Sequence, residues 1–259
     1  MATTKATFNV VSSALASGNA TDGYVLTADG SGNAAWEEVA GGPTFKAFGT
    51  NSIMVGDNAT GTIDAANQNT ALGLDVFAAL TSADDNTAIG FETLKAATTG
   101  HSNTAVGSQA LKSLVDDSHQ VAVGFQALMN ETVSGSNVAV GSLALTTSNG
   151  GSNNVAVGKQ ALTSSTTADH NVAIGSNALA AITDGHSNVA IGYLAASTLA
   201  TGATYQTRNN VAIGREALEN QATQEDNVCI GYQALGTGNS ASNSQITAIG
   251  SQTANAAHA

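Results

Sequence analysis

Adjacent acidic residues are the first candidates for chemistry in this sequence. They occur as Glu37-Glu38, Asp84-Asp85, Asp116-Asp117 and Glu225-Asp226. Two carboxylates held a defined distance apart around a sugar could hydrolyse a glycosidic bond. However, the pairs lie in stretches of variable sequence or near the N-terminus, and the chain has only 4 Tyr and 1 Trp to line a sugar groove. We therefore expect solvated loop charge and no enzymatic activity, with a glycan-degrading spike as an alternative.

Histidines and a cysteine are the next candidates. His101, His119, His170 and His186 each lie one or two positions before a recurring Asn or Gln. Histidines around a threefold axis could bind a metal, but these positions are also turns in which a histidine is tolerated. We predict no metal site and no cofactor. The single Cys229 excludes an internal disulfide framework, and we expect a buried, inert thiol.

A short sequence motif, called the phrase below, recurs from residue 52 onward and sets where most of these side chains lie along the chain. Its clearest copies are NVAVGKQAL, NVAIGSNAL and NVAIGREAL, which begin at 154, 171 and 210. The phrase glycine recurs after 17 residues eight times in succession, and then after 22, 17 and 19. These longer steps indicate insertions within 197–209 and near 236–245. The phrase glycines are Gly56, Gly73, Gly90, Gly107, Gly124, Gly141, Gly158, Gly175, Gly192, Gly214, Gly231 and Gly250.

Each phrase predicts one short strand, because its Val-Ala-Ile centre is rich in β-branched residues and is bounded by Asn and Gly. Side chains alternate along a strand, so Val172 and Ile174 point to one face and Ala173 to the other. Two apolar faces are typical of stacked parallel strands. The glycine suits a corner with positive φ, and the Asn column, with Gln120 as a variant, can stack its amides. We predict an all-β parallel β-solenoid of about twelve 17-residue coils.

A column of small residues occupies the middle of the predicted strands. Small side chains let backbones approach closely, so we expect this column to pack against copies of the chain around a common axis. The prediction is a homo-oligomer, most simply a homotrimer. The column consists of Met54, Ala71, Ala88, Ala105, Ala122, Ala139, Ala156, Ala173, Ala190, Ala212, Cys229 and Ala248.

At the position directly after the phrase glycine, large and small residues alternate from one copy to the next over much of the repeat. Neighbouring coils lie about 4.8 Å apart, so we expect each large ring to cover the small residue above or below it. The alternative is an exposed aromatic stripe that binds sugars. The residues are Phe91, Ser108, Phe125, Ser142, Lys159, Ser176, Tyr193, Arg215 and Tyr232.

The sequence divides into an N-terminal segment (1–50), a repeat rod (51–254) and a short tail (255–259). In the first segment, YVLTAD and AAWEEV flank a turn-rich Gly-Ser-Gly-Asn stretch and indicate a hairpin. Trp36 is either a local core residue or an attachment anchor that is buried in a partner.

The insertion within 197–209 must leave the surface of the coil. It carries Tyr205 and Arg208, two residue types that are enriched at binding hot spots. A receptor contact and a plain surface loop are both open interpretations.

Charge and hydropathy exclude other classes of partner. The formal net charge is -12, which opposes binding to nucleic acid or to an anionic membrane surface. No apolar run reaches the roughly 20 residues that a membrane-spanning helix needs. The first residues lack the basic and apolar regions of a secretory signal.

The phrase NVAIGxxAL, repeated in phase with glycine-marked corners over residues 52 to about 254, resembles the head repeats of trimeric YadA-like adhesins and related repeats of bacteriophage tail fibres. This resemblance implies a left-handed parallel β-roll that assembles as a homotrimer. The segment GYVLTADGSGNAAW (23–36) resembles a segment near the start of many phage tail proteins, which implies contact with other virion proteins.

From this resemblance we expect a virion fibre or appendage that is assembled in the host cytoplasm. It would attach to a host surface glycan or protein, or act as a rigid spacer. The head of a bacterial trimeric surface adhesin is the alternative. The start of the chain, which lacks a secretory signal pattern, favours the virion component.

Overall fold

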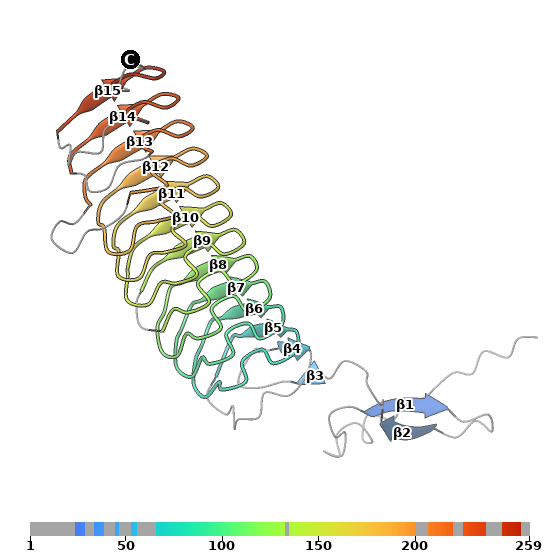
Figure 1. Cartoon of the computed structure of the whole chain (residues 1–259). Helices are drawn as coiled ribbons and strands as arrows, with labels where there is room; N and C mark the ends of the chain where they lie inside the picture. The colour runs from blue at the N-terminus through green and yellow to red at the C-terminus, as the bar shows by residue number, and fades with distance from the viewer. Residues whose placement is uncertain are drawn as a thin grey trace, which may run out of the picture.

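The computed structural model of the chain describes residues 24–28, 34–38, 45–46, 53–55, 66–132, 135–199, 207–219, 225–236 and 245–254. The regular elements in these ranges are all strands (Figure 1). They are β1 (Tyr24–Ala28), β2 (Ala34–Glu38), β3 (Phe45–Lys46), β4 (Ile53–Val55), β5 (Thr70–Leu72), β6 (Thr87–Ile89), β7 (Thr104–Val106), β8 (Val121–Val123), β9 (Val138–Val140), β10 (Val155–Val157), β11 (Val172–Ile174), β12 (Val189–Ile191), β13 (Val211–Ile213), β14 (Val228–Ile230) and β15 (Thr247–Ile249).

The strands from β4 to β15 stack in parallel in chain order, and β3 pairs antiparallel with β4 at the end of the stack (Figure 1). Pairing is in register, so that the Ala of each strand lies beside the equivalent residue of the next coil, as Ala156 does beside Ala173. The chain is an all-β parallel β-solenoid of about nine turns with coils of about 17 residues. The coil-to-coil step is 22 residues at Asn188–Asn210 and 19 residues at Asn227–Ile246, which confirms the two predicted insertions. Both leave the register of the strands intact.

The strands β1 and β2 form a separate antiparallel pair. Tyr24 lies opposite Glu38, and Leu26 lies opposite Trp36. The Gly-Ser-Gly-Asn stretch falls between these two strands in the sequence.

The core is built from columns that take one residue from each coil. The Ala in the middle of each strand is buried, and so is the Ala-Leu pair that ends the phrase; Ala173, Ala178 and Leu179 are each 0% exposed. All three belong to one apolar cluster that runs through the coils. The expectation that the Ala column packs at an axis between chains is therefore wrong, because its own coil encloses it.

The outer face of the stack consists of the strand residues on either side of the buried Ala. These are mostly Val and Ile, and they are half-buried along the stack. Exposure is higher at Ile174, with 38%, and toward the two ends, with 49% at Leu72 and 65% at Ile249. We call these two columns the Val/Ile face. It is the β-branched side of the strand, rather than the Ala side, that the single chain leaves open.

A buried asparagine in each coil links that coil to the next. The side chain of Asn171 donates from Nδ2 to the carbonyl oxygen of Gly185 at 2.8 Å, within its own coil. Its Oδ1 accepts the backbone N–H of Asn188 at 2.9 Å and the Nδ2 of Asn188 at 3.0 Å, in the next coil. Gln120 keeps the acceptor role, since its Oε1 accepts the backbone N–H of Asn137 at 3.0 Å. The predicted amide ladder is confirmed.

The phrase glycines form the corner after each strand. From Gly73 to Gly250 their φ angles lie between 126° and 141°, which confirms the expected positive φ; Gly56 is outside the described residues. A Cβ added at Gly141 would lie 2.5 Å from the carbonyl oxygen of Gly158 in the next coil. The corners therefore stack too closely for any side chain.

Gly141→Ala should lower the free energy of unfolding by about 2–5 kcal/mol, because a strained backbone and an overpacked contact both add to its cost. Urea denaturation followed by circular dichroism measures the change. Gly135→Ala is the matched control, since the nearest atom to its added Cβ is 3.5 Å away, and it should stay within about 0.5 kcal/mol of the native chain. Equal stability of the two variants would contradict the close stacking of the corners.

Candidate functional site: the outer columns of the rod

One aspartate in each of three acidic pairs accepts a hydrogen bond from a nearby amide. Asp84 accepts the backbone N–H of Asn67 in the preceding coil at 2.6 Å, and Asp226 accepts the Nδ2 of Asn209 at 3.0 Å. Asp117 accepts the backbone N–H that follows it, at 2.7 Å. The side chains of Glu37 and Glu38 lie outside the described residues. These contacts give Asp84, Asp117 and Asp226 a structural role.

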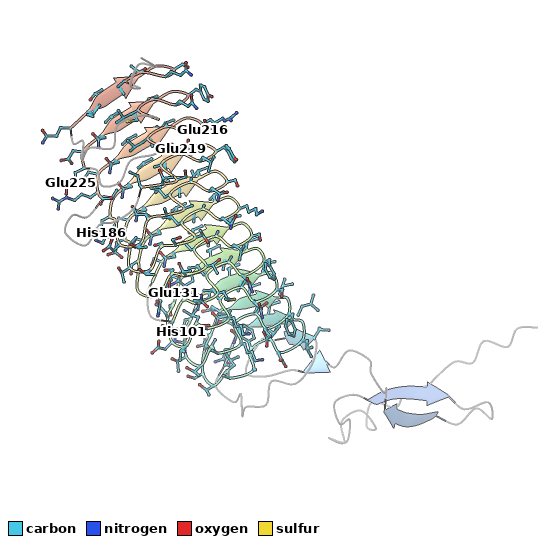
Figure 2. The ribbon with its side chains drawn as sticks, in the orientation of Figure 1. His101, Glu131, His186, Glu216, Glu219 and Glu225 are labelled. Atoms are coloured by element: carbon cyan, nitrogen blue, oxygen red, sulfur yellow. The ribbon has the colours of Figure 1, made fainter. Side chains whose placement is uncertain are left out.

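The histidines occupy two different columns. His101 and His186 share one column, in which Nδ1 accepts the backbone N–H of Asp84 at 3.0 Å and of Asp169 at 3.2 Å, respectively. Figure 2 shows these two histidines along the same edge of the rod. His119 and His170 lie at turns with φ of 65° and 57°. In the described ranges, no group of three or more His, Cys, Asp or Glu residues could hold a metal ion.

The structure describes only some of the predicted receptor and attachment residues. Arg208 is exposed and pairs with Glu225 of the next coil at 3.4 Å. Tyr205 lies outside the described residues, and so does the side chain of Trp36, whose backbone belongs to β2. No helix in the part of the chain that the structure describes is long and apolar enough to cross a membrane.

Cys229 replaces an alanine in the buried strand column. It is a free thiol with 0% exposure, and burial raises its pKa to about 11. A thiol with so high a pKa carries little thiolate at neutral pH. The expected buried position is confirmed.

Sequence reasoning missed a polar section of the core. The hydroxyl of Ser148 donates to Oε2 of the buried Glu131 at 2.6 Å. Within the described residues, Oε1 of Glu131 and Oγ of Ser165 are buried without a hydrogen-bond partner. The signal was present, because the equivalent positions in other coils hold Leu114 and Ile182.

The aromatic residues after the phrase glycines are exposed. The exposed fractions are 44% for Phe91, 50% for Phe125, 50% for Tyr193 and 41% for Tyr232. The expectation that each ring is covered by packing on its neighbours is therefore corrected in favour of the alternative, an exposed aromatic stripe. We call the residues that follow the phrase glycines from Gly90 to Gly231 the corner stripe. In chain order they are Phe91, Ser108, Phe125, Ser142, Lys159, Ser176, Tyr193, Arg215 and Tyr232.

One part of the corner stripe carries a cation between two aromatic rings. The guanidinium of Arg215 lies 5.8 Å from the ring centre of Tyr193 and 5.7 Å from that of Tyr232. Its Nε donates to Oε1 of Glu216 at 2.8 Å, which lowers the pKa of this carboxylate. Figure 2 shows Glu216 on the edge of the rod opposite to His186 and Glu225. The corner stripe therefore runs along a different edge from the His column.

A ladder of polar side chains accompanies the corner stripe, one residue further along the chain. Gln109 donates from Nε2 to Oε2 of Glu92 at 2.8 Å, and Gln126 donates to Oε1 of Gln109 at 2.7 Å. The same bond recurs between Gln233 and Glu216 at 2.8 Å. Exposed rings are thus flanked by aligned amides and carboxylates.

Glu92 is the centre of an ion network at the start of this ladder. It accepts hydrogen bonds from Lys112 and Lys95, both at 2.6 Å, and Lys95 also bonds Asp75 at 3.0 Å. The Glu92 side chain is 12% exposed. Its bonds to Lys112, Lys95 and Gln109 lower the pKa of the carboxylate from 4.5 to about 2.

Comparison of the chain with protein-family models, curated proteins and solved structures gives no significant match. The function is therefore inferred from the surfaces of the rod and from the repeat phrase.

The substitution Glu92→Gln should make the melting temperature fall less as the pH is lowered. Because folding lowers the pKa of Glu92, the stability it adds is present above about pH 4.5 and is lost as the pH falls toward about 2. We expect the variant to melt below the native chain at pH 7 and at the same temperature near pH 2. Thermal denaturation at several pH values measures this, with Asp116→Asn as a control at an exposed carboxylate. A gap between Glu92→Gln and the native chain that does not change with pH would contradict the ion network.

Proposed function

We propose that this protein is a structural and adhesive fibre protein of a bacteriophage virion. It attaches the particle to its host cell or acts as a rigid spacer. The observation that carries the proposal is the in-register parallel stack from β4 to β15, which makes one continuous, stiff element with a repeating surface. The NVAIGxxAL phrase and its resemblance to adhesin heads and phage fibres support the same function.

We further propose that the rod has twelve coils, winds left-handed and assembles as a homotrimer. The Val/Ile face supports an assembly, because large apolar patches on a protein surface mark interaction sites. It carries Val or Ile on both sides of the buried residue from β8 to β14, and these residues are mostly half-buried within one chain. We place the interface between chains on this face, since the Ala column is enclosed. With a strand spacing of about 4.8 Å, twelve coils give a rod of about 58 Å.

The N-terminal segment, residues 1–50, is the proposed attachment to other virion proteins. The antiparallel pairing of β1 and β2, outside the solenoid sheet, supports a separate small element. Trp36 is the proposed anchor, and Tyr205 with Arg208 the proposed receptor contact on the longer loop. This function requires no enzymatic activity, cofactor, nucleic acid or membrane insertion.

The native chain should sediment as a trimer, at three times the chain mass of 25.6 kDa. Val155→Glu combined with Val172→Glu places charges on the Val/Ile face and should give monomers with native circular dichroism. Thr99→Glu combined with Thr167→Glu, at exposed turns, is the control that should remain trimeric. A monomeric native chain, or trimers of the Val variant, would rule out this interface.

Electron microscopy of particles labelled with an antibody against the purified chain tests the proposed location. We expect label on an appendage of the virion. Label on the bacterial surface in the absence of phage would favour the adhesin alternative and overturn the proposed function.

A further inference from the structure

We propose that the corner stripe binds a linear, neutral, extended glycan that runs parallel to the axis of the rod. The section concerned lies after strands β6 to β10 and runs from Phe91 to Lys159. This inference rests on the proposed adhesive function and names the ligand class and the residues that bind it.

The spacing of the rings is the first argument. Phe91 follows β6 and Phe125 follows β8, so the two rings are two coils apart. Because neighbouring strands lie about 4.8 Å apart, equivalent positions two coils apart repeat about every 9.6 Å. This is close to the length of one disaccharide in an extended glycan. Each ring can therefore stack on the apolar face of every second sugar. Lys159 occupies the equivalent position two coils after Phe125.

The backbone holds the rings at this spacing. The carbonyl oxygen of Phe91 accepts the backbone N–H of Gln109 at 2.7 Å, and that of Phe125 accepts the backbone N–H of Leu143 at 2.9 Å. Each ring is thus mounted on a corner that is bonded to the next coil. A pre-organised site loses less conformational entropy when it binds.

The residues between and beside the rings suit sugar hydroxyls. Ser108 and Ser142 are half-buried and occupy the coils that lack a ring in this section. The ladder bonds of Gln109 and Gln126 use one N–H of each amide. An amide has two N–H donors, so within the described residues a second donor is left at each position for a hydroxyl group. Rings and hydroxyls alternate along the section, and the amides of Gln109 and Gln126 lie beside them, so that apolar and polar groups are both offered to a sugar chain.

Charge favours a neutral glycan over an acidic one. The chain carries a formal net charge of -12. At the start of the section, Asp75 and Glu92 are paired with Lys95 and Lys112, so the repulsion comes from the chain as a whole. A polyanion would be repelled by this field.

The stripe also differs from a surface made for another protein copy. Its rings are separated by serines, whereas the Val/Ile face is continuous and suits packing between chains. Further along, the guanidinium of Arg215 lies over the rings of Tyr193 and Tyr232 and places a cation there, whereas a serine separates Phe91 from Phe125.

Isothermal titration calorimetry of the full chain with hexasaccharides tests the proposal. Cellohexaose and chitohexaose are the extended neutral probes, maltohexaose is the coiled control and hexagalacturonate the acidic one. We expect one or both extended probes to bind and the two controls to bind at least about tenfold more weakly. Phe91→Ala combined with Phe125→Ala should weaken binding about tenfold or more, as truncation of aromatic anchors does.

A shifted-ring variant distinguishes the effect of ring spacing on affinity from nonspecific binding to apolar surface. Phe125→Ala combined with Ser108→Phe keeps two rings but places them in adjacent coils, and it should lose affinity as the double alanine variant does. Val115→Ala removes apolar surface at a position that is 39% exposed outside the stripe, and it should bind as the native chain does.

Three results would overturn the assignment. They are no binding of either extended probe, full affinity in the double alanine variant, or full affinity in the shifted-ring variant. Sedimentation of the ring variants adds a further test, because dissociation of an oligomer would place the rings in an interface between chains. Binding by the purified chain together with label on the bacterial surface would instead contradict only the virion function, so the two proposals fail separately.

Discussion

The buried asparagine ladder is the interaction on which the rest of the structure depends. A buried amide without partners costs free energy, and each asparagine avoids this cost through two kinds of bond. One closes its own coil onto a carbonyl 14 residues later, and the other joins it to the asparagine 17 residues later. This pair of bonds closes each coil and sets its register against the next. Where the chain is longer, the ladder is still made, as Asn210 donates to Asn188 across 22 residues, and the extra residues must leave the coil as a loop.

Every other column follows from this fixed period. Equivalent residues lie in register, so each residue type that recurs in the phrase forms a column along the rod. Alanines and leucines form a thin core, glycines form corners that stack without side chains, and Val and Ile form an outer apolar face. The residue after the glycine forms a line of exposed rings on a separate edge. The proposed fibre function would use these properties as a rigid axis, a face for other copies and a repeated surface for a ligand.

Much of this order could be predicted from the sequence, because it is periodic. The strands, the glycine corners with positive φ, the amide ladder and the place of the insertions all follow from spacing and residue type. The direction of the strand faces could not be deduced in the same way. A strand such as Val172–Ile174 is apolar on both sides, and large residues ordinarily fill a core. The interior of this coil already holds Ala178 and Leu179, and only a small residue such as Ala173 fits beside them.

The surface needed the structure for a related reason. Alternation of Phe91, Ser108 and Phe125 is compatible with rings that cover serines and with rings that face solvent, and only the exposed fractions of 44% and 50% distinguish the two. The polar section at Glu131 was visible as a break in an otherwise apolar column that includes Leu114 and Ile182, but its burial required the fold.

Hydrogen exchange measured residue by residue tests the dependence on the ladder most directly. The backbone N–H groups of the ladder residues, such as Asn154, Asn171 and Asn188, are buried donors to the preceding asparagine. They should exchange slowly, in a pattern that repeats every 17 residues and continues across the longer loop at Asn210. Exchange of these amides as fast as that of the exposed turns would contradict the ladder as the interaction that holds the coils together.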